Sequence, residues 1–144
     1  MTPDAELRPV LEVKEDVMLH IVESKKPLAD LTRDLEKAVA RHKFGVLHVH
    51  DLKAKMAEKG VPFAHECRIF EVCNPQQTKK VLEANLKIST VLPCRISVYE
   101  DGRATKLATI KPTAMIALFA TPALQAVAEE VEVTLGAIMA EAAG

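Results

Sequence analysis

Aromatic side chains are scarce in this chain of 144 residues, which has no tryptophan, one tyrosine (Tyr99) and four phenylalanines. Proteins that bind single-stranded nucleic acid without sequence preference stack bases on aromatic rings, and little material for such a platform is present. The overall charge does not compensate, because 19 basic and 20 acidic residues leave a formal net charge of -1. Nucleic acids and anionic membranes attract basic surfaces. The sequence therefore predicts neither a nucleic-acid nor a membrane partner.

Long apolar runs are also missing, since no stretch approaches the ~20 apolar residues of a membrane-spanning helix. The first nine residues include Asp4 and Glu6 and no apolar run, unlike a secretory signal. The three cysteines, Cys67, Cys73 and Cys94, form an odd number without an export signal, which argues against a disulfide framework. We expect a soluble, cytoplasmic protein with reduced thiols.

The length and the 49% hydrophobic content suit one domain with a core of its own. We expect an N-terminal extension over residues 1–13 and a single domain over residues 14–141. Apolar periodicity and turn residues predict the elements within it. The expected strands cover residues 17–22, 45–50, 66–72, 94–100 and 103–110; the expected helices cover 27–42 and 75–84, with two closing helices that begin at Pro112 and at Thr121-Pro122. Residues 52–64 are expected to form a surface loop with at most one helical turn.

Asp101-Gly102 between two apolar strands predicts a tight hairpin, and a hairpin requires antiparallel pairing. The expected order is β-α-β-β-α-β-β-α-α. Interleaved helices together with antiparallel strands are typical of the α+β class rather than of a doubly wound parallel sheet. We predict an antiparallel sheet in a two-layer domain, with the helices packed on one face.

Several short motifs in order resemble a known family. They are Lys43-Phe44-Gly45-Val46-Leu47, Asp51-Leu52-Lys53-Ala54-Lys55 with Lys59-Gly60, Arg68-Ile69-Phe70, Val72-Cys73-Asn74-Pro75, Leu92-Pro93-Cys94 and Val98-Tyr99-Glu100-Asp101-Gly102. Together they resemble the domain of unknown function 302 over roughly residues 14–141. The chain departs from the pattern of this subgroup at Cys67, Glu71 and Ser89, where relatives often have tyrosine, glycine and glycine.

The resemblance implies an α+β domain with one layer of sheet and one of helices, related to the TATA-binding-protein-like folds and commonly a homodimer. It implies no established activity, although some relatives occur in settings of sulfur oxidation or metal handling. The likeness to the TATA-binding protein is one of fold, and a shared fold does not imply DNA binding.

The first candidate site is the ligand-binding set Cys73, Asn74, Cys94 and Arg95. Cys73 precedes Asn74, a good N-cap, so unpaired amides and the positive end of the helix dipole are expected to favour its thiolate. Cys94 shares parity with Ile96 and is expected on the helix-covered face of its strand. Both cysteines could instead be buried structural residues. If the two are neighbours, they could form a reversible disulfide, hold a soft metal or pass a sulfane sulfur.

The second candidate site is a set of histidines, His20, His48 and His50. Strict alternation after Gly45 places Val46, His48 and His50 on one face of a strand, with the two imidazoles about 7 Å apart, a spacing that one transition metal can bridge. His20 is expected on the same sheet face. Half-exposed histidines without a ligand are the alternative interpretation.

Three functions remain open at this stage. The first is a non-enzymatic homodimer that binds a small ligand, metal or sulfur species through the Cys73 and Cys94 region. The second is a transition-metal or haem site on the histidine face, and the third is a structural dimerisation module without a ligand. An enzyme stays open as well but is not favoured, because no spacing assembles a general base, a nucleophile and an orienting group.

Overall fold

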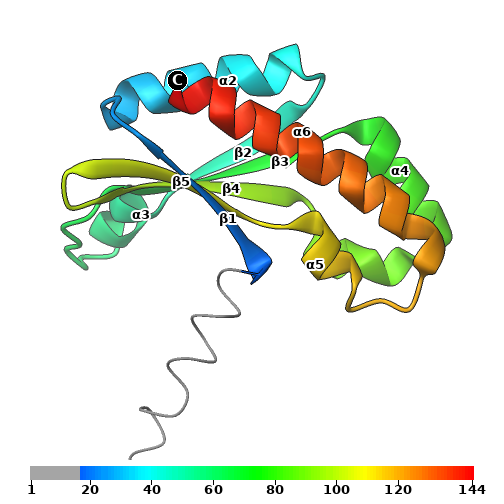
Figure 1. Ribbon diagram of the computed structural model, residues 1–144. Coiled ribbons are helices and arrows are strands. Elements are labelled where there is room, and N and C mark those ends of the chain that lie inside the picture. Colours follow the sequence, from blue (N-terminus) through cyan, green and yellow to red (C-terminus); the bar gives the residue numbers. More distant parts are fainter. Residues whose placement is uncertain (1–16) are drawn as a thin grey trace, which may run out of the picture.

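The computed structural model describes residues 17–144, which form a sheet covered on one face by helices (Figure 1). Five antiparallel strands lie in the order β1-β5-β4-β3-β2. The strands are β1 (Leu19–Ser24), β2 (Gly45–Asp51), β3 (Cys67–Cys73), β4 (Cys94–Asp101) and β5 (Ala104–Ile110). The predicted α+β class with an antiparallel sheet and packed helices is confirmed.

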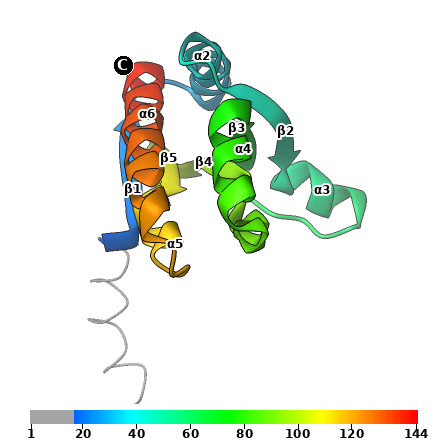
Figure 2. The same ribbon diagram turned by 90° about the vertical axis from the view of Figure 1, so that its right-hand side faces the viewer.

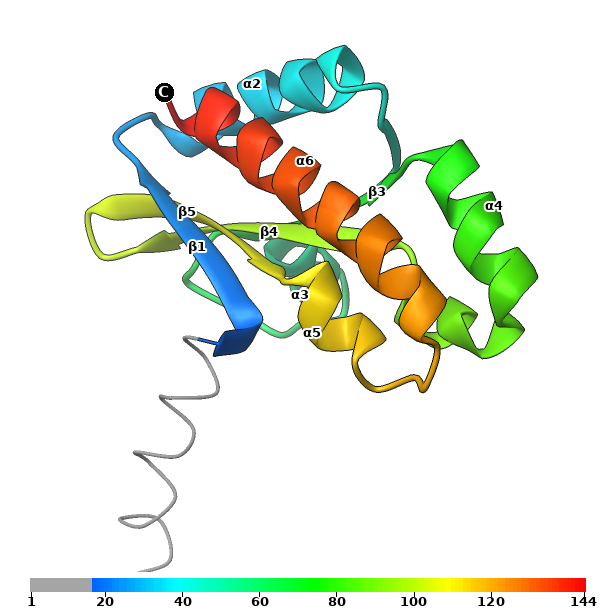
Figure 3. The same cartoon turned by 45° about the vertical axis from the view of Figure 1, so that its right-hand side comes forward.

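The helices that cover the sheet are amphipathic or apolar, and they share one side of it (Figure 2). They are α2 (Leu28–Arg41), α4 (Pro75–Ala84), α5 (Pro112–Ile116) and α6 (Gln125–Ala143); short 3-10 turns, η1 (Leu86–Val91) and η2 (Pro122–Leu124), precede β4 and α6. Helix α6 crosses the sheet diagonally and reaches from α5 to α2 (Figure 3). None of the helices within residues 17–144 is both long and apolar enough to cross a bilayer.

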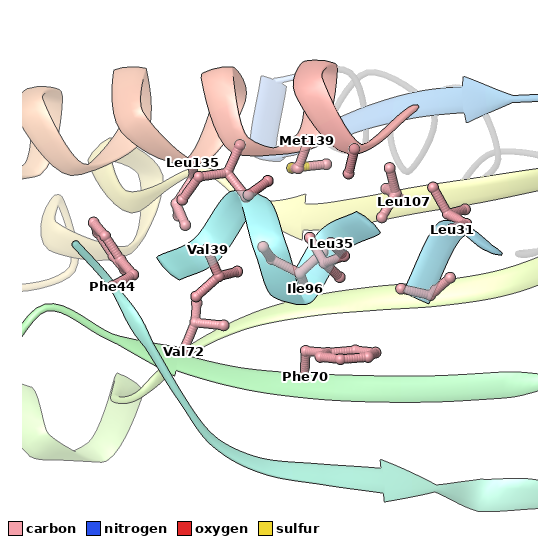
Figure 4. Packing of buried hydrophobic residues seen from close by; sticks show 14 of the residues in the cluster. Leu31, Leu35, Val39, Phe44, Phe70, Val72, Ile96, Leu107, Leu135 and Met139 are labelled. Atoms are coloured by element: carbon pink, nitrogen blue, oxygen red, sulfur yellow. The ribbon is translucent and has the colours of Figure 1, made fainter. Parts of the chain in front are cut away.

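The core lies between the sheet and the helices α2 and α6, whose apolar sides face each other and the strands (Figure 4). Helix α2 contributes Leu31 and Leu35, both fully buried, at the four-residue spacing that places side chains on one helical face. Phe70 and Ile96 meet them from adjacent strands, because β3 and β4 pair these two residues directly. This face is therefore the packed side of the sheet, and within residues 17–144 it is the face on which α2 and α6 pack.

Most predicted elements are found within one or two residues, and α4 has the predicted bounds. The hairpin is present, with Asp101 paired to Ala104 and Gly102 at a φ of +65°, a left-handed conformation that glycine adopts without steric cost. The first strand begins at Leu19 rather than at Val17.

The expectation of a loop over residues 52–64 is wrong at its start, where α3 (Leu52–Glu58) forms. The Asp51 carboxylate accepts a hydrogen bond from the Ala54 amide at 3.0 Å and so caps this helix. Helix α3 lies beyond β2 at the edge of the sheet, apart from the other helices (Figure 2).

Candidate functional site

The two proline-flanked cysteines meet at one end of the sheet. Cys73 ends β3, Cys94 begins β4, and the antiparallel register pairs Cys94 with Val72, the residue next to Cys73. Both cysteines line one cavity of about 60 Å³, which is room for a ligand of a few heavy atoms. The fold therefore makes the two cysteines neighbours, as a joint role of their thiols requires.

The cavity walls are mainly apolar and come from six elements, β3, α4, η1, β4, α5 and α6, and from short connecting segments. Its lining consists of Phe44, Val72, Cys73, Asn74, Gln77, Thr78, Val81, Ile88, Val91, Leu92, Cys94, Pro112, Met115, Ile116, Val127, Ala128 and Val131. No aspartate, glutamate or histidine of the described chain is among these residues. The cavity can thus hold a small ligand next to a thiol, but it offers no carboxylate or imidazole as a general base.

The polar groups of the cavity lie on α4. The Cys73 Sγ atom is 3.0 Å from the Thr78 Oγ1 atom, and either atom can donate the hydrogen bond. One helical position earlier, the Gln77 Oε1 atom is buried and has no hydrogen-bond partner within residues 17–144. A buried acceptor without a partner carries a desolvation cost that a bound donor would relieve.

Asn74 acts as the predicted N-cap, and this corrects one step of the sequence reasoning. Its Oδ1 atom accepts hydrogen bonds from the Gln76 and Gln77 amides, each at 3.1 Å, and its backbone oxygen accepts one from the Thr78 amide at 3.0 Å. Pro75 has no N–H group. The first-turn amides that were expected to stabilise a Cys73 thiolate are therefore used within the helix, and the Thr78 hydroxyl is the group that contacts the sulfur.

Cys94 lies on the packed face, as its parity predicts, and contacts the main core. Burial, followed by the neighbouring Cys73 sulfur, raises the pKa of the Cys94 thiol to about 11. Cys94 is therefore a neutral thiol at physiological pH. Of the two cysteines, Cys73 is the one with a polar contact and an environment compatible with reaction.

Arg95 was predicted to belong with these residues, and the structure contradicts that assignment. Alternation along β4 places Cys94 and Ile96 on the packed face and Arg95 on the open face. There Arg95 lines a separate groove of about 510 Å³. The candidate site thus retains Cys73, Asn74 and Cys94 and loses Arg95.

The predicted three-histidine site does not form. His20 pairs with Thr109 of β5 and lies on the packed face, where its Nε2 atom is near Gly136 of α6. His48 and His50 do share the open face, with ring centroids 4.4 Å apart. The prediction for His20 is wrong because the face of a β1 residue relative to β2 depends on the register of the whole sheet, in which β1 and β2 are the two edge strands.

A β-bulge in β2 corrects the assignment of Val46. The register shifts between Val46 and His48, so Leu47 is the extra residue and is 62% exposed. Val46 and Val49 then both pack against the core. Strict alternation had predicted Val46 on the histidine face.

His50 is engaged with a neighbouring carboxylate rather than open to a ligand. Its Nε2 atom contacts the Glu71 Oε1 atom, and this hydrogen bond, aided by the charges of Arg95 and His48, holds the pKa of Glu71 below its ordinary value. Within residues 17–144, no group of three histidine, cysteine, aspartate or glutamate side chains is arranged to hold a metal ion. The open face therefore carries a hydrogen-bonded histidine–carboxylate pair at this position.

Two residues of the cavity, Thr78 and Gln77, were missed by the sequence reasoning. The available signal was the spacing of Thr78 four positions after the N-cap Asn74, since residues i and i+4 share one face of a helix. Cys67 lies apart from this site, because it pairs with Tyr99 at the opposite end of β3.

Comparison with known proteins agrees with the fold. The family described as "Domain of unknown function DUF302" matches residues 20–142. A crystal structure of an uncharacterised conserved DUF302 protein from Bacillus stearothermophilus is similar to this chain, with a TM-score of 0.83 and 32% sequence identity, covering 87% of this chain and 98% of that one. No functionally curated protein matches.

Proposed function

Because the chain belongs to the DUF302 family, whose description names no ligand, we propose from the geometry that it binds a small thiol-reactive species at Cys73, with sulfane sulfur as the ligand class. One observation carries this proposal. Cys73 and the neutral thiol of Cys94 line the same small, mainly apolar cavity.

The reaction that loads the site is a sulfur transfer without net oxidation. The Cys73 thiolate attacks the outer sulfur of a persulfide donor, R–S–SH. A new S–S bond forms at Cys73, the S–S bond of the donor breaks, and the donor leaves as the thiolate R–S⁻. The product is a Cys73 persulfide, in which the transferred sulfur occupies the cavity.

The surroundings suit storage of this sulfur better than turnover. The Thr78 hydroxyl can donate to the reacting sulfur, and the apolar walls limit access of water. A soft metal is less favoured, because the cavity offers only two thiols, one of which is neutral, and metals bind the thiolate form. The absence of a base among the cavity residues favours a binding protein over an enzyme.

Mass spectrometry of the intact protein tests the proposal. The reduced protein is incubated with sodium tetrasulfide, desalted and measured under native conditions. We expect a mass increase of one sulfur atom in the wild type and in Cys67→Ser, and none in Cys73→Ser. Cys67 is the matched control, since it lies on the same strand outside the cavity.

A second variant tests the contribution of the cavity separately from that of the Cys73 thiol. Ala128, on α6, lines the cavity, so Ala128→Val adds two methyl groups there and leaves Cys73 unchanged. We expect this variant to fold and to retain less added sulfur than the wild type. Equal labelling of Cys73 and Cys67, with no effect of Ala128→Val, would show ordinary thiol reactivity and would end the proposal.

We propose separately that the chain forms a homodimer. The support is its resemblance to a family whose members are commonly homodimers. Sedimentation equilibrium of the reduced protein over a range of concentrations measures the oligomeric state. A monomer at all concentrations would contradict it, and the sulfur-binding proposal would be unaffected.

A further inference from the structure

The open face of the sheet carries a second hollow that the Cys73 site does not use. It is a groove of about 510 Å³, within the range of roughly 300–1,000 Å³ that is typical for small-molecule sites. Its walls are mostly apolar and include Leu19, Ile69, Leu92, Pro93 and Ile110. The volume and lining suit a molecule with an apolar body.

Three polar side chains of the groove form a row on one strand. Arg95, Ser97 and Tyr99 alternate along β4 and therefore point to the same face, about 7 Å apart in successive steps. Ile69 and Ala108 flank Ser97 on the neighbouring strands, because the register pairs Ser97 with both of them. A guanidinium and two hydroxyls thus lie in line on a mainly apolar floor.

The Arg95 guanidinium has no ion-pair partner in the described part of the chain, where every carboxylate is more than 4.0 Å away. The nearest acidic candidate, Glu71, is its register partner on β3, but the Glu71 carboxylate contacts His50 instead. The charge of Arg95 is therefore free to meet a ligand.

We infer that this groove binds a free amphipathic carboxylate, with the carboxylate on Arg95 and the apolar body along the floor. A guanidinium matches a carboxylate in a planar, two-bond geometry. A singly charged ligand is favoured over a phosphate dianion, because the Glu71 carboxylate is close enough to interact with the Arg95 charge. The site is independent of the Cys73 proposal.

Octanoate is the probe, and the chain supplies its own reporter. Tyr99 is the sole tyrosine, no tryptophan is present, and Tyr99 lines the groove, so intrinsic fluorescence reports on it directly. Titration of the wild type with octanoate should saturate. Octanol has the same chain length without the charge and should bind about tenfold more weakly, because a charge-assisted bond is lost.

Matched variants test whether Arg95 binds the carboxylate of octanoate. Arg95→Gln should bind octanoate about tenfold more weakly and octanol as the wild type does, whereas Arg95→Lys should lie between them. Arg33→Gln is the control, because Arg33 pairs with Asp30 on the exposed side of α2. Ser97→Ala, which removes a neutral donor, should give a smaller loss. Circular dichroism checks that each variant is folded, and Cys73→Ser should bind octanoate like the wild type.

Two outcomes would overturn the inference. One is octanoate binding that is absent or that Arg95→Gln leaves unchanged. The other is a wild type that does not bind octanoate and sediments as a dimer, with Ile110→Asp converting it to a monomer. That result would assign the groove to a second copy of the chain.

Discussion

Cys73 owes its environment to a side-chain hydroxyl. The Asn74 cap uses the amides of the first turn of α4, and the Thr78 hydroxyl, one turn further on, contacts the sulfur at 3.0 Å. A hydroxyl at this position can donate a hydrogen bond to the sulfur as it reacts. The reactivity of Cys73 thus depends on one residue that can be replaced without disturbing the cap.

Thr78→Val removes the hydroxyl and keeps the shape of the side chain. A hydrogen bond to a charged group contributes about 1.5–3 kcal/mol, and the loss of about 1.4 kcal/mol of transition-state stabilisation corresponds to about a tenfold change in rate. We expect alkylation of Cys73 by iodoacetamide at neutral pH to slow by up to about tenfold. Thr78→Ser retains the hydroxyl and should react like the wild type; equal rates for Thr78→Val would show that the contact has no chemical role.

Glu71 gives the open face a pH dependence. Its pKa lies below the ordinary value of 4.5, with the His50 hydrogen bond as the largest cause. A carboxylate with a lowered pKa in the folded state stabilises the fold above its unfolded-state pKa, and this contribution is lost as the pH falls through the folded-state value.

The melting temperature of Glu71→Gln checks this sign. Near neutral pH the variant should melt below the wild type, and the difference should shrink as the pH falls below 4.5 and then vanish. Glu83→Gln, on the exposed surface of α4, is the control and should show no such trend. A difference that grows in acid would contradict the assignment.

At the scale of the elements, α4 connects the fold to the candidate site. It begins at Pro75 behind the Asn74 cap, and its first turn holds both Gln77 and Thr78 against the cavity. Fraying of this turn would therefore move the polar groups of the site as well as weaken the helix.

Asn74→Ala should lower the free energy of unfolding by about 0.5–2 kcal/mol, because two first-turn amides lose their acceptor. Urea denaturation followed by circular dichroism measures it. Asn74→Asp keeps the acceptor and should stay within about 0.5 kcal/mol of the wild type. If the alanine variant is as stable as the wild type, water replaces the cap at no cost.

Elements with a local signal were predictable from the sequence. The cap and proline at residues 74–75 define the start of α4, and Asp101-Gly102 defines the hairpin. Helix α3 had a signal that was overlooked, namely the N-cap Asp51 followed by helix-forming residues. The bulge at Leu47 had none, because an extra residue in a strand is defined by its partner strand rather than by its own sequence.

The candidate site was predictable in part for the same reason. Parity placed Cys94 on the packed face, and the cap placed Asn74, both from local sequence. The residues that surround Cys73 depend on the pairing of β3 with β4 and on α6, which lies more than 50 positions away in the chain. The face of His20 follows from the register of all five strands, which no single segment encodes. The face of Arg95 was available locally, because alternation along β4 places it opposite Cys94.

At the scale of the whole molecule, α6 joins two apolar clusters. Its C-terminal half, with Leu135 and Ile138, packs into the main core, and Ala128 in its first part belongs to a smaller cluster around Ile88 and Ile116. The cavity beside Cys73 borders this smaller cluster. Stability and site geometry are thus supported by different ends of one helix.

Leu135→Ala should lower the free energy of unfolding by about 2–5 kcal/mol, because the side chain is 1% exposed in the main core. Val133→Ala on the same helix is the control, since Val133 is 74% exposed, and it should change the stability by no more than about 0.5 kcal/mol. Urea denaturation measures both variants. Similar losses for the two would contradict the orientation of α6.

The cavity beside Cys73 and the groove beside Arg95 share the side chains of Val91, Leu92 and Met115 as walls. A ligand that shifts these side chains from one side changes the space on the other. The two hollows are therefore expected to be energetically coupled, and thermodynamic linkage makes such coupling reciprocal: whatever factor octanoate imposes on the binding of a sulfur species, that species imposes on octanoate.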